Sequence, residues 1–461
     1  MQIVVQKFGG SSVADAARMR TCAQRAIDAK REGKSVVVVV SAMGDTTDEL
    51  LDLAAQVAGE GSEAGPRLQS GGGGAVPRRE LDQLMATGEQ VSIALMAMTL
   101  CRMGHEAVSL TGAQSGILTE AVHTRAKIRS IGPERLMREL EAGRIPVVAG
   151  FQGMTEAGET TTLGRGGSDT TAVALAAALK AEVCEIYTDV DGVYSADPRL
   201  VPNARLHDRI TYDEMMEAAS QGAKVMHLRA VEVGKKSGVP IRVLHSQRGT
   251  RQSGTLICGE RDVFESRVIS AVALKSDIGR VTIAGLPNRA GVQRELFGPI
   301  AEHGISVDDI IQNEVHTDAT RLSGPSDKCT IAFTVEKSDL AEVRPLVERA
   351  VERMVRVGAH GDGVGVSGGD PAISVDMGLV KVSAVGVGMQ SQSGVAATMF
   401  KALADAGIKI QNITTSEIKI SCLLAEADGK TALRVVHDAF GLGGEEDRAT
   451  RDASGAVKSS R

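Results

Sequence analysis

The stretch that most constrains the fold of this chain runs from Val147 to Thr171, with the sequence VVAGFQGMTEAGETTTLGRGGSDTT. An apolar strand, Ile145 to Ala149, opens into a loop that ends in GRGGSD, and an alanine-rich helix, Thr170 to Lys180, follows. Glycines let a ligand approach the backbone, and a helix N-terminus presents unpaired N–H groups and partial positive charge. This order therefore predicts an anion-binding turn, in which Arg165 offers a planar guanidinium. Capping of the helix by Ser168 or Asp169 is the alternative explanation, and anion binding and capping can occur together.

The same order of strand, glycine turn and helix opens the chain. A short strand, Ile3 to Val5, leads to KFGGSS at Lys7 to Ser12, and a helix is expected over Val13 to Lys30. An ammonium group beside glycine N–H groups could bind phosphate, although a solvated lysine next to a tight turn is the alternative. The five valines from Val36 to Val40 suit a strand of a parallel sheet that is buried on both faces.

Composition limits the class of partner. A chain of 461 residues is long enough for two or three domains. With a net charge of −6, no tryptophan and 2% aromatic residues, it has little with which to bind nucleic acid or an anionic membrane, so a small substrate is favoured. Its six cysteines are scattered singly through apolar segments, and the N-terminal MQIVVQKFGG lacks the pattern of a signal peptide, so we expect buried thiols and a cytoplasmic location.

Further polar groups follow other predicted strands. Ser41 to Thr47 come directly after the valine run, where open α/β sheets hold their ligands, although capping of a helix over Asp48 to Val57 would also explain them. Thr188 to Arg199, TDVDGVYSADPR, has carboxylates, a Tyr and an Arg that could hold a nucleotide with Mg²⁺, or simply form turns. A lone Glu89 within the helical run Leu81 to Met103 is ordinarily a solvent-facing residue.

Alternating strands and helices over residues 1–248 predict a mostly parallel sheet with helices on both faces. A polar boundary at 249–266 precedes an internal repeat, in which Gly291 to Gly304 and Gly394 to Gly407 have equal separation and similar flanks. Two βαββ modules are therefore expected at 267–350 and 373–440, with a linker at 351–372 and a disordered tail at 441–461. The G-x-G-x-x-G in the linker opens no helix, so a dinucleotide site is rejected, and the Gly-rich 59–79 is interpreted as a surface loop.

Together these motifs resemble the aspartokinases, which are amino-acid kinases with paired C-terminal ACT domains. The marks of the resemblance, in order, are KFGGSS at Lys7, SAMGDTT at Ser41, GE at Gly88, GRGGSD at Gly164 and TDVDGVYSADPR at Thr188. The resemblance implies an amino-acid kinase fold followed by two ACT modules. It also implies phosphorylation of the side-chain carboxylate of L-aspartate by ATP, with Mg²⁺, at the entry to lysine, threonine and methionine synthesis.

The resemblance assigns roles to individual residues. The catalytic residues would be Lys7 and Asp189. ATP would be bound by Lys7, Gly9, Gly10, Ser11, Thr188, Asp189, Tyr194, Ser195, Ala196, Asp197, Pro198, Arg199 and Lys224. Aspartate would be bound by Ser41, Thr47, Glu89, Arg165, Gly166, Gly167 and Ser168, with Glu89 on its amino group and Arg165 on its α-carboxylate. No residue is assigned to a protein-bound metal.

The ACT pair implies feedback inhibition by lysine, threonine or both, and a homo-oligomer formed through these modules. The effector positions would be Asn288, Gly291, Gln312, Asn313, Asn412 and Ile413. Asn288 stands where the family often has an aspartate, which weakens amine recognition there. No Met lies between Met226 and Met354, so an internal ATG start for a separate regulatory chain is not expected. The alternatives are an amino-acid kinase with another substrate and an inactive amino-acid sensor.

Overall fold

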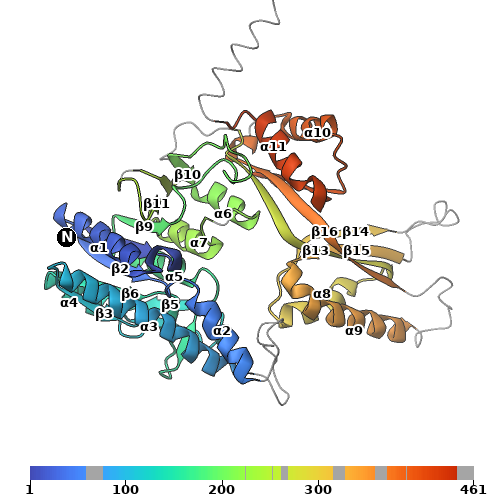
Figure 1. Cartoon of the computed structure of the whole chain (residues 1–461). Helices are drawn as coiled ribbons and strands as arrows, with labels where there is room; N and C mark the ends of the chain where they lie inside the picture. The colour runs from blue at the N-terminus through green and yellow to red at the C-terminus, as the bar shows by residue number, and fades with distance from the viewer. Residues whose placement is uncertain are drawn as a thin grey trace, which may run out of the picture. The chain divides into compact units, whose positions relative to one another are not determined.

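The computed structural model describes residues 1–58, 76–223, 225–251, 253–260, 268–314, 328–358, 371–390 and 392–443. The chain forms two compact units (Figure 1). The first contains Met1–Ala271, Val385–Gln390 and the chain from Leu442, and the second contains Val272–Ala384 and Ser391–Gly441. Most of the Gly-rich 59–79, most of the 351–372 linker and nearly all of the 441–461 tail lie outside the described residues.

An eight-stranded sheet forms the centre of the first unit, with the order β10-β12-β11-β9-β1-β2-β6-β3. Only β11 and β12 pair antiparallel; the other neighbours in this sheet are parallel, as expected. The strands are β1 (Ile3–Phe8), β2 (Ser35–Val40), β3 (Ala107–Leu110), β6 (Ile145–Ala149), β9 (Val183–Thr188), β10 (Arg209–Thr211), β11 (Ile241–His245) and β12 (Thr255–Cys258).

Helices cover both faces of this sheet, and the valine run shows why. Successive side chains of a strand point to opposite faces. Val37 and Val39 pack in one core with α4 (Glu134–Glu141), α5 (Gly167–Ala178), α6 (Tyr212–Ser220) and α7 (Leu228–Ser237). Val36, Val38 and Val40 pack in the other with α1 (Ala16–Arg31) and α3 (Arg78–Arg102). The prediction of a strand buried on both faces is confirmed.

Several short elements differ from the expectation. The segment between Ala149 and Gly164 contains β7 (Gln152–Met154) and β8 (Thr160–Thr162), which join β4 (Ile117–Thr119) and β5 (Ile128–Ile131) in a second sheet of order β5-β4-β7-β8. Strands of three or four residues are too short to show a sequence period. The expected linker 249–266 contains β12, a strand of the main sheet, and the expected helix over 213–234 is divided into α6 and α7.

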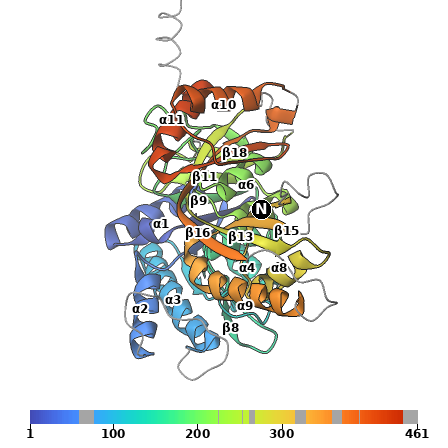
Figure 2. The same ribbon diagram turned by 90° about the vertical axis from the view of Figure 1, so that its right-hand side faces the viewer.

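The second unit consists of the two expected modules, which share one six-stranded sheet of order β14-β15-β13-β16-β18-β17. The first module contains β13 (Ala271–Pro287), α8 (Val292–Glu302), β14 (Asp308–Glu314), β15 (Lys328–Val335) and α9 (Leu340–Gly358). The second repeats this order with β16 (Ala372–Val385), α10 (Val395–Asp405), β17 (Asn412–Thr415), β18 (Lys419–Ala425) and α11 (Gly429–Ala439). In both views α8 lies beside α9 and α10 beside α11 (Figures 1 and 2). Helix α9 extends past residue 350, so the first module is longer than expected.

Five of the six cysteines are buried, as expected, and Cys101 is exposed. One helix within the described ranges, α3, is long and apolar enough to span a membrane by length and composition. Half of its apolar window is buried within the chain, and it packs against α1, α2 (Thr46–Val57) and the sheet, which is the position of a core helix.

Candidate active site

Four neighbouring parallel strands, β9, β1, β2 and β6, end at the same edge of the main sheet. Phe8 is in register with both Val40 and Tyr187, and Val40 is in register with Ala149. The segments that begin at Gly9, Ser41, Gly150 and Asp189 therefore leave this edge side by side. The topology thus brings together the motifs that the sequence analysis found far apart, at the edge where open α/β sheets bind ligands.

The first glycine turn is packed tightly against the Ser41–Thr47 segment. The Gly44 N–H donates to the Gly10 carbonyl at 3.1 Å, and a Cβ placed on Gly10 would lie 2.7 Å from the Ala42 carbonyl oxygen. Gly10 is therefore needed for this close approach. A 3-10 turn, Gly10–Val13, follows directly, and the Gly9 N–H before it donates to the Tyr187 carbonyl at 3.3 Å.

Lys7 meets Asp169 across this edge. Its Nζ lies 2.6 Å from the Asp169 carboxylate, and the two side chains are only 11% and 14% exposed. Neither Ser168 nor Asp169 caps α5, whose N-cap is Gly166 without a side-chain bond, so the capping explanation is wrong. Apart from capping, the sequence had indicated no role for Asp169. The one available signal was a lysine within a strand that is largely buried, because a buried ammonium needs a counter-charge, but nothing local identified Asp169 as that partner.

The turn before α5 is held in a left-handed conformation. Gly166 has a φ of 69°, and a Cβ there would lie 2.1 Å from the His227 ring. Burial lowers the pKa of His227, which the sequence analysis had not singled out. Ser168 is buried against Gly150, where a Cβ would lie 2.7 Å from the Ser168 Oγ. Arg165 is exposed, and within the described ranges no hydrogen bond or ion pair holds its guanidinium.

Glu89 faces this edge from α3, so the solvent-facing alternative is wrong. It is 2% exposed, and its Oε1 accepts the Ala42 N–H at 3.0 Å. Its Oε2 is buried with no hydrogen-bond partner among the residues that the structure describes. Burial raises the pKa of Glu89 to about 7. A buried carboxylate oxygen without a donor is costly unless a ligand supplies one.

Ser41 and Thr47 are partly buried on either side of the Gly44 turn. Capping of α2 does not explain this segment, because its N-cap, Asp45, makes no side-chain cap bond.

The segment after β9 contributes a second set of polar groups. The Thr188 Oγ1 donates to Asp189 at 3.0 Å, and the Tyr194 hydroxyl donates to Asp191 at 3.2 Å. Asp189 is exposed at the strand end, beside the first glycine turn. Arg199 pairs with Asp197 at 2.8 Å and lowers the pKa of that carboxyl.

Other expected nucleotide contacts are placed differently. Ser195 is fully buried, and its hydroxyl donates to the Leu442 carbonyl at 3.2 Å and accepts the Arg205 N–H at 2.9 Å. Ala196 is buried and Pro198 is partly buried. Lys224 lies outside the described residues.

The expected effector residues divide into two groups. In the first module Asn288 donates to Glu314 at 3.3 Å, Gln293 donates to Gln312 at 2.7 Å, and Gly291 begins α8 with a φ of 96°. Asn313 lies on β14 between Gln312 and Glu314. Asn412 and Ile413 lie on β17, which is at the opposite edge of the six-stranded sheet from β14. Within one chain, the four expected effector residues of the first module therefore lie close together. Asn412 and Ile413 of the second module do not lie beside them.

Across the described part of the chain, no group of three or more His, Cys, Asp or Glu side chains is arranged to hold a metal ion.

The chain is similar to known proteins over nearly its whole length. Residues 2–245 match the amino acid kinase family, and residues 382–440 match an ACT domain. The chain is 45% identical to an aspartokinase from Bacillus sp. (strain MGA3), over 98% of this chain and 100% of the relative. It is 45% identical to aspartate kinase Ask_LysC from Stutzerimonas stutzeri, over 96% of this chain and 98% of the relative.

Among solved structures it is similar to E. coli aspartokinase III in complex with aspartate and ADP in the R-state. The identity is 26%, the coverage 95% of this chain and 99% of the other, and the TM-score 0.74. The T-state of the same enzyme with lysine and aspartate gives 25% identity, coverage of 95% and 100%, and a TM-score of 0.68.

Proposed function

Since this chain belongs to the aspartokinases, and is thus an ATP-dependent aspartate kinase, we propose that its substrate is recognised by Glu89 and Arg165 at the carboxyl edge of the main sheet. The unpartnered Oε2 of Glu89 carries this proposal. A buried carboxylate oxygen with no donor suits the α-ammonium group of an amino acid, and an exposed guanidinium suits its α-carboxylate. Ser41, Thr47, Gly166, Gly167 and Ser168 complete the binding surface for aspartate.

The side-chain carboxylate of aspartate is then the nucleophile. One of its oxygens bonds to the γ-phosphorus of ATP while the bond from that phosphorus to the β,γ-bridging oxygen breaks, which gives 4-phospho-L-aspartate and ADP. A carboxylate is already ionised at neutral pH, so no general base is needed. Lys7 neutralises charge on the transferring phosphoryl group together with the N–H group of Gly10, because the Gly9 N–H donates to the Tyr187 carbonyl at 3.3 Å.

In this scheme Asp169 positions Lys7. It pairs with Lys7 at 2.6 Å and so fixes the ammonium group where β1 meets α5. Because Asp169 lies one residue after Ser168, this ion pair also joins the phosphate-binding and aspartate-binding parts of the site.

ATP lies across the ends of β1 and β9 in this proposal. Its contacts are Ser11, Thr188, Asp189, Tyr194, Ser195, Ala196, Asp197, Pro198, Arg199 and Lys224. Ser195 would act through its backbone carbonyl, because its hydroxyl and its N–H are bonded within the unit. Mg²⁺ accompanies ATP, because kinases bind this ion mainly through substrate phosphates and one or two carboxylates. The exposed carboxylate of Asp189 would be one of them.

Regulation is proposed to occur at the edges of the six-stranded sheet. The E. coli aspartokinase III structure with lysine provides the precedent for an amino-acid effector. Because β14 and β17 are opposite edges of one sheet, Gln312 and Asn313 can meet Asn412 and Ile413 only when a second copy adds its sheet edge. We therefore expect a cytoplasmic homo-oligomer inhibited by lysine, threonine or both. An inactive sensor is disfavoured, since the chain contains Lys7, Glu89 and Arg165.

Substrate analogues test the recognition proposal. Succinate lacks the α-amino group of aspartate, and β-alanine lacks the α-carboxylate. The wild-type enzyme should discriminate strongly against both, Glu89→Gln should lose discrimination against succinate, and Arg165→Ala should lose discrimination against β-alanine. If Glu89→Gln distinguished aspartate from succinate as well as the wild type does, the role of Glu89 would be wrong.

A further inference from the structure

A buried carboxylate that contributes no atom to the proposed site lies on the same helix as Glu89. Asp82 is fully buried on α3, seven residues before Glu89, and both side chains are on the buried side of that helix. Seven residues make about two helical turns, or about 10 Å of rise. We propose that Asp82 is a positioning residue for Arg165, and so sets recognition of the α-carboxylate of the substrate. This inference rests on the proposed role of Arg165.

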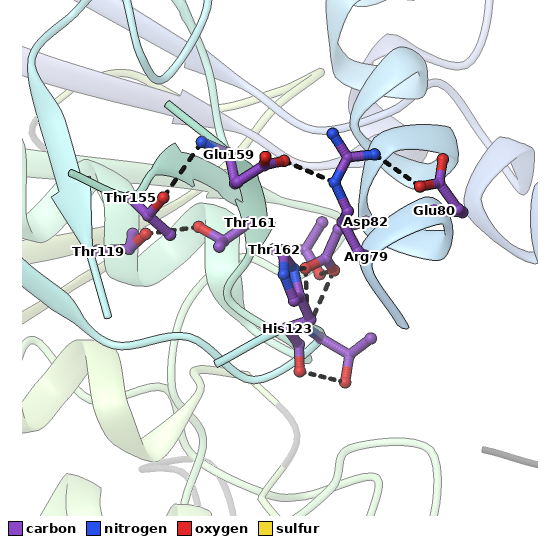
Figure 3. A network of polar contacts seen from close by, with 10 residues as sticks. Arg79, Glu80, Asp82, Thr119, His123, Thr155, Glu159, Thr161 and Thr162 are labelled. Carbon is purple, nitrogen blue, oxygen red and sulfur yellow. Dashed lines mark hydrogen bonds and ion pairs between the residues drawn. The ribbon is translucent and has the colours of Figure 1, made fainter. Parts of the chain in front are cut away.

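Asp82 binds two segments that are distant in sequence. Its carboxylate accepts the Thr124 N–H at 3.0 and 3.1 Å, and it contacts the Nδ1 of His123 at 2.7 Å. The Thr162 hydroxyl, at the end of β8, donates to the same carboxylate. Figure 3 shows the side chains of His123 and Thr162 converging on Asp82. The 123–126 segment and the end of β8 are therefore joined through one carboxylate of α3.

These two segments lead directly to Arg165. Thr162 is three residues before it, and the Ala126 N–H donates to the Thr162 carbonyl at 3.0 Å. Gly164 has a φ of 75°, and a Cβ there would lie 3.1 Å from the Thr124 carbonyl oxygen. The base of the Arg165 turn thus packs on the residue whose N–H is held by Asp82.

Thr124 itself has a positive φ of 68°, a strained conformation for a β-branched residue. The bond to Asp82 stabilises this conformation, and the Thr124 hydroxyl adds a bond to the His123 carbonyl at 2.7 Å. From the other side, Arg229 of α7 donates to the Leu163 and Ala126 carbonyls. The turn is therefore fixed from α3 and from α7.

The bonds that Asp82 accepts fix the geometry of both segments, which an apolar side chain could not do. Burying an ionised group is expensive, and well-packed apolar residues often replace such groups without loss of stability. What Asp82 provides is geometric: one helix presents Glu89 to the amino group and, through Asp82, sets the turn that presents Arg165 to the α-carboxylate. A small displacement of a binding group can cost large factors in rate, so this placement affects specificity.

The test is a double-mutant cycle with β-alanine as an internal control. In Asp82→Asn, the KM for L-aspartate should rise about tenfold through misplacement of Arg165. The inhibition constant of β-alanine and the KM for ATP should change less than about twofold. β-Alanine has no α-carboxylate to contact Arg165, and ATP is bound by other residues. In the Arg165→Ala background, Asp82→Asn should have almost no further effect on L-aspartate.

Two further variants guard against misfolding of Asp82→Asn. His123→Ala removes one partner at the partly exposed side of the cluster, and Thr162→Val removes another; each should raise the KM for L-aspartate about threefold with β-alanine unaffected. Arg79→Ala is the matched control, because it breaks exposed ion pairs to Glu80 and Glu159 in the same region without touching Asp82, and it should leave all three constants unchanged.

The outcomes separate this inference from the proposed function. Equal weakening of L-aspartate and β-alanine by Asp82→Asn, or effects that multiply with those of Arg165→Ala, would overturn the inference alone. If Arg165→Ala itself left discrimination against β-alanine intact, the role of Arg165 in the proposed function would fail first.

Discussion

At the scale of single residues, the site depends on groups that the surrounding fold leaves incomplete. Glu89 is the clearest case, because one of its oxygens accepts the Ala42 N–H and the other has no donor among the described residues. Burial raises the pKa of this carboxyl to about 7, so the free enzyme carries a mixture of charged and neutral Glu89 near neutral pH. An ammonium ligand requires the charged form.

This predicts the pH dependence of aspartate binding. The kcat/KM for L-aspartate should fall about tenfold per unit as the pH drops below about 7, because protonated Glu89 cannot pair with the ammonium group. The kcat should fall only at lower pH, since bound ammonium lowers the pKa of Glu89. Steady-state kinetics from pH 5.5 to 9 would measure both. Glu89→Gln should abolish this fall of kcat/KM at low pH, and Glu80→Gln, on the exposed part of α3, should retain it. A wild-type pH profile without this fall would contradict the role of Glu89 in binding the ammonium group.

The same pKa has a consequence for stability. A carboxyl whose folded pKa exceeds its unfolded value stabilises the fold at low pH, and this contribution is lost as the pH rises from about 4.5 to about 7. Glu89→Gln should therefore gain thermal stability relative to the wild type at pH 8 compared with pH 5. Melting curves of both proteins at the two pH values would show it, and an equal difference at both would count against a raised pKa.

Gly166 gives a test of steric fit at the aspartate-binding turn. Gly166 and Gly158 both have a positive φ, but a Cβ at Gly166 would meet the His227 ring at 2.1 Å, whereas a Cβ at Gly158 would meet nothing within 4 Å. Gly158→Ala should lose only the backbone preference, about 1 kcal/mol of unfolding free energy, and keep its KM for L-aspartate. Gly166→Ala should lose more stability and raise that KM. Equal behaviour of the two variants in denaturant titrations and kinetics would show that the His227 contact is unimportant.

At the scale of elements, the sequence predicted what long periodic segments determine and missed what short or distant contacts determine. The valine run and the repeat around Gly291 and Gly394 were sufficient for the main sheet and the two modules, because burial on both faces and equal spacing are visible in the chain itself. The hairpin of β7 and β8 and the antiparallel strand β12 were not predicted, since three or four residues show no period. The Lys7–Asp169 pair and the bonds of Asp82 join residues far apart in sequence, so no local pattern reports them.

Lys381 of β16 provides an element-scale test in the second unit. It is 1% exposed, and its Nζ lies 2.6 Å from Asp308 and 2.8 Å from Asp309, at the start of β14. It therefore ties the first strand of one module to the other module. Lys381→Met leaves the carboxylate of Asp309, whose side chain is 6% exposed, without its ammonium partner and should cost about 3 kcal/mol of unfolding free energy. Lys401→Met, which breaks an exposed pair with Asp405, should cost less than about 0.5 kcal/mol.

Denaturant unfolding monitored by hydrogen exchange in β13 and β16 would measure both variants. If β13 and β16 were as protected from hydrogen exchange in Lys381→Met as in the wild type, the ion pair would not connect the two modules.

At the scale of the whole molecule, the proposed regulation requires more than one copy. Both edges of the six-stranded sheet carry an exposed isoleucine: Ile310 on β14 is 53% exposed and Ile413 on β17 is 44% exposed. Exposed apolar edge strands favour pairing with another chain. Light scattering should therefore show an oligomer, and Ile310→Lys should reduce its mass and weaken inhibition by lysine or threonine while keeping the uninhibited kcat. Val57→Lys, at an 83% exposed site in the first unit, is the control. A wild-type monomer that is still inhibited would contradict this arrangement.

The chemical step in Lys7→Ala tests the proposed active site most directly. Acyl phosphate formed from L-aspartate and Mg·ATP can be trapped with hydroxylamine and quantified against ADP release. We expect the wild type and Lys34→Ala, whose lysine pairs with Glu182 away from the site, to form equal amounts. In Lys7→Ala we expect kcat to fall by about 10²- to 10³-fold with the KM for L-aspartate little changed. Full trapping activity in Lys7→Ala would show that phosphoryl transfer does not occur at the carboxyl edge of the main sheet as described.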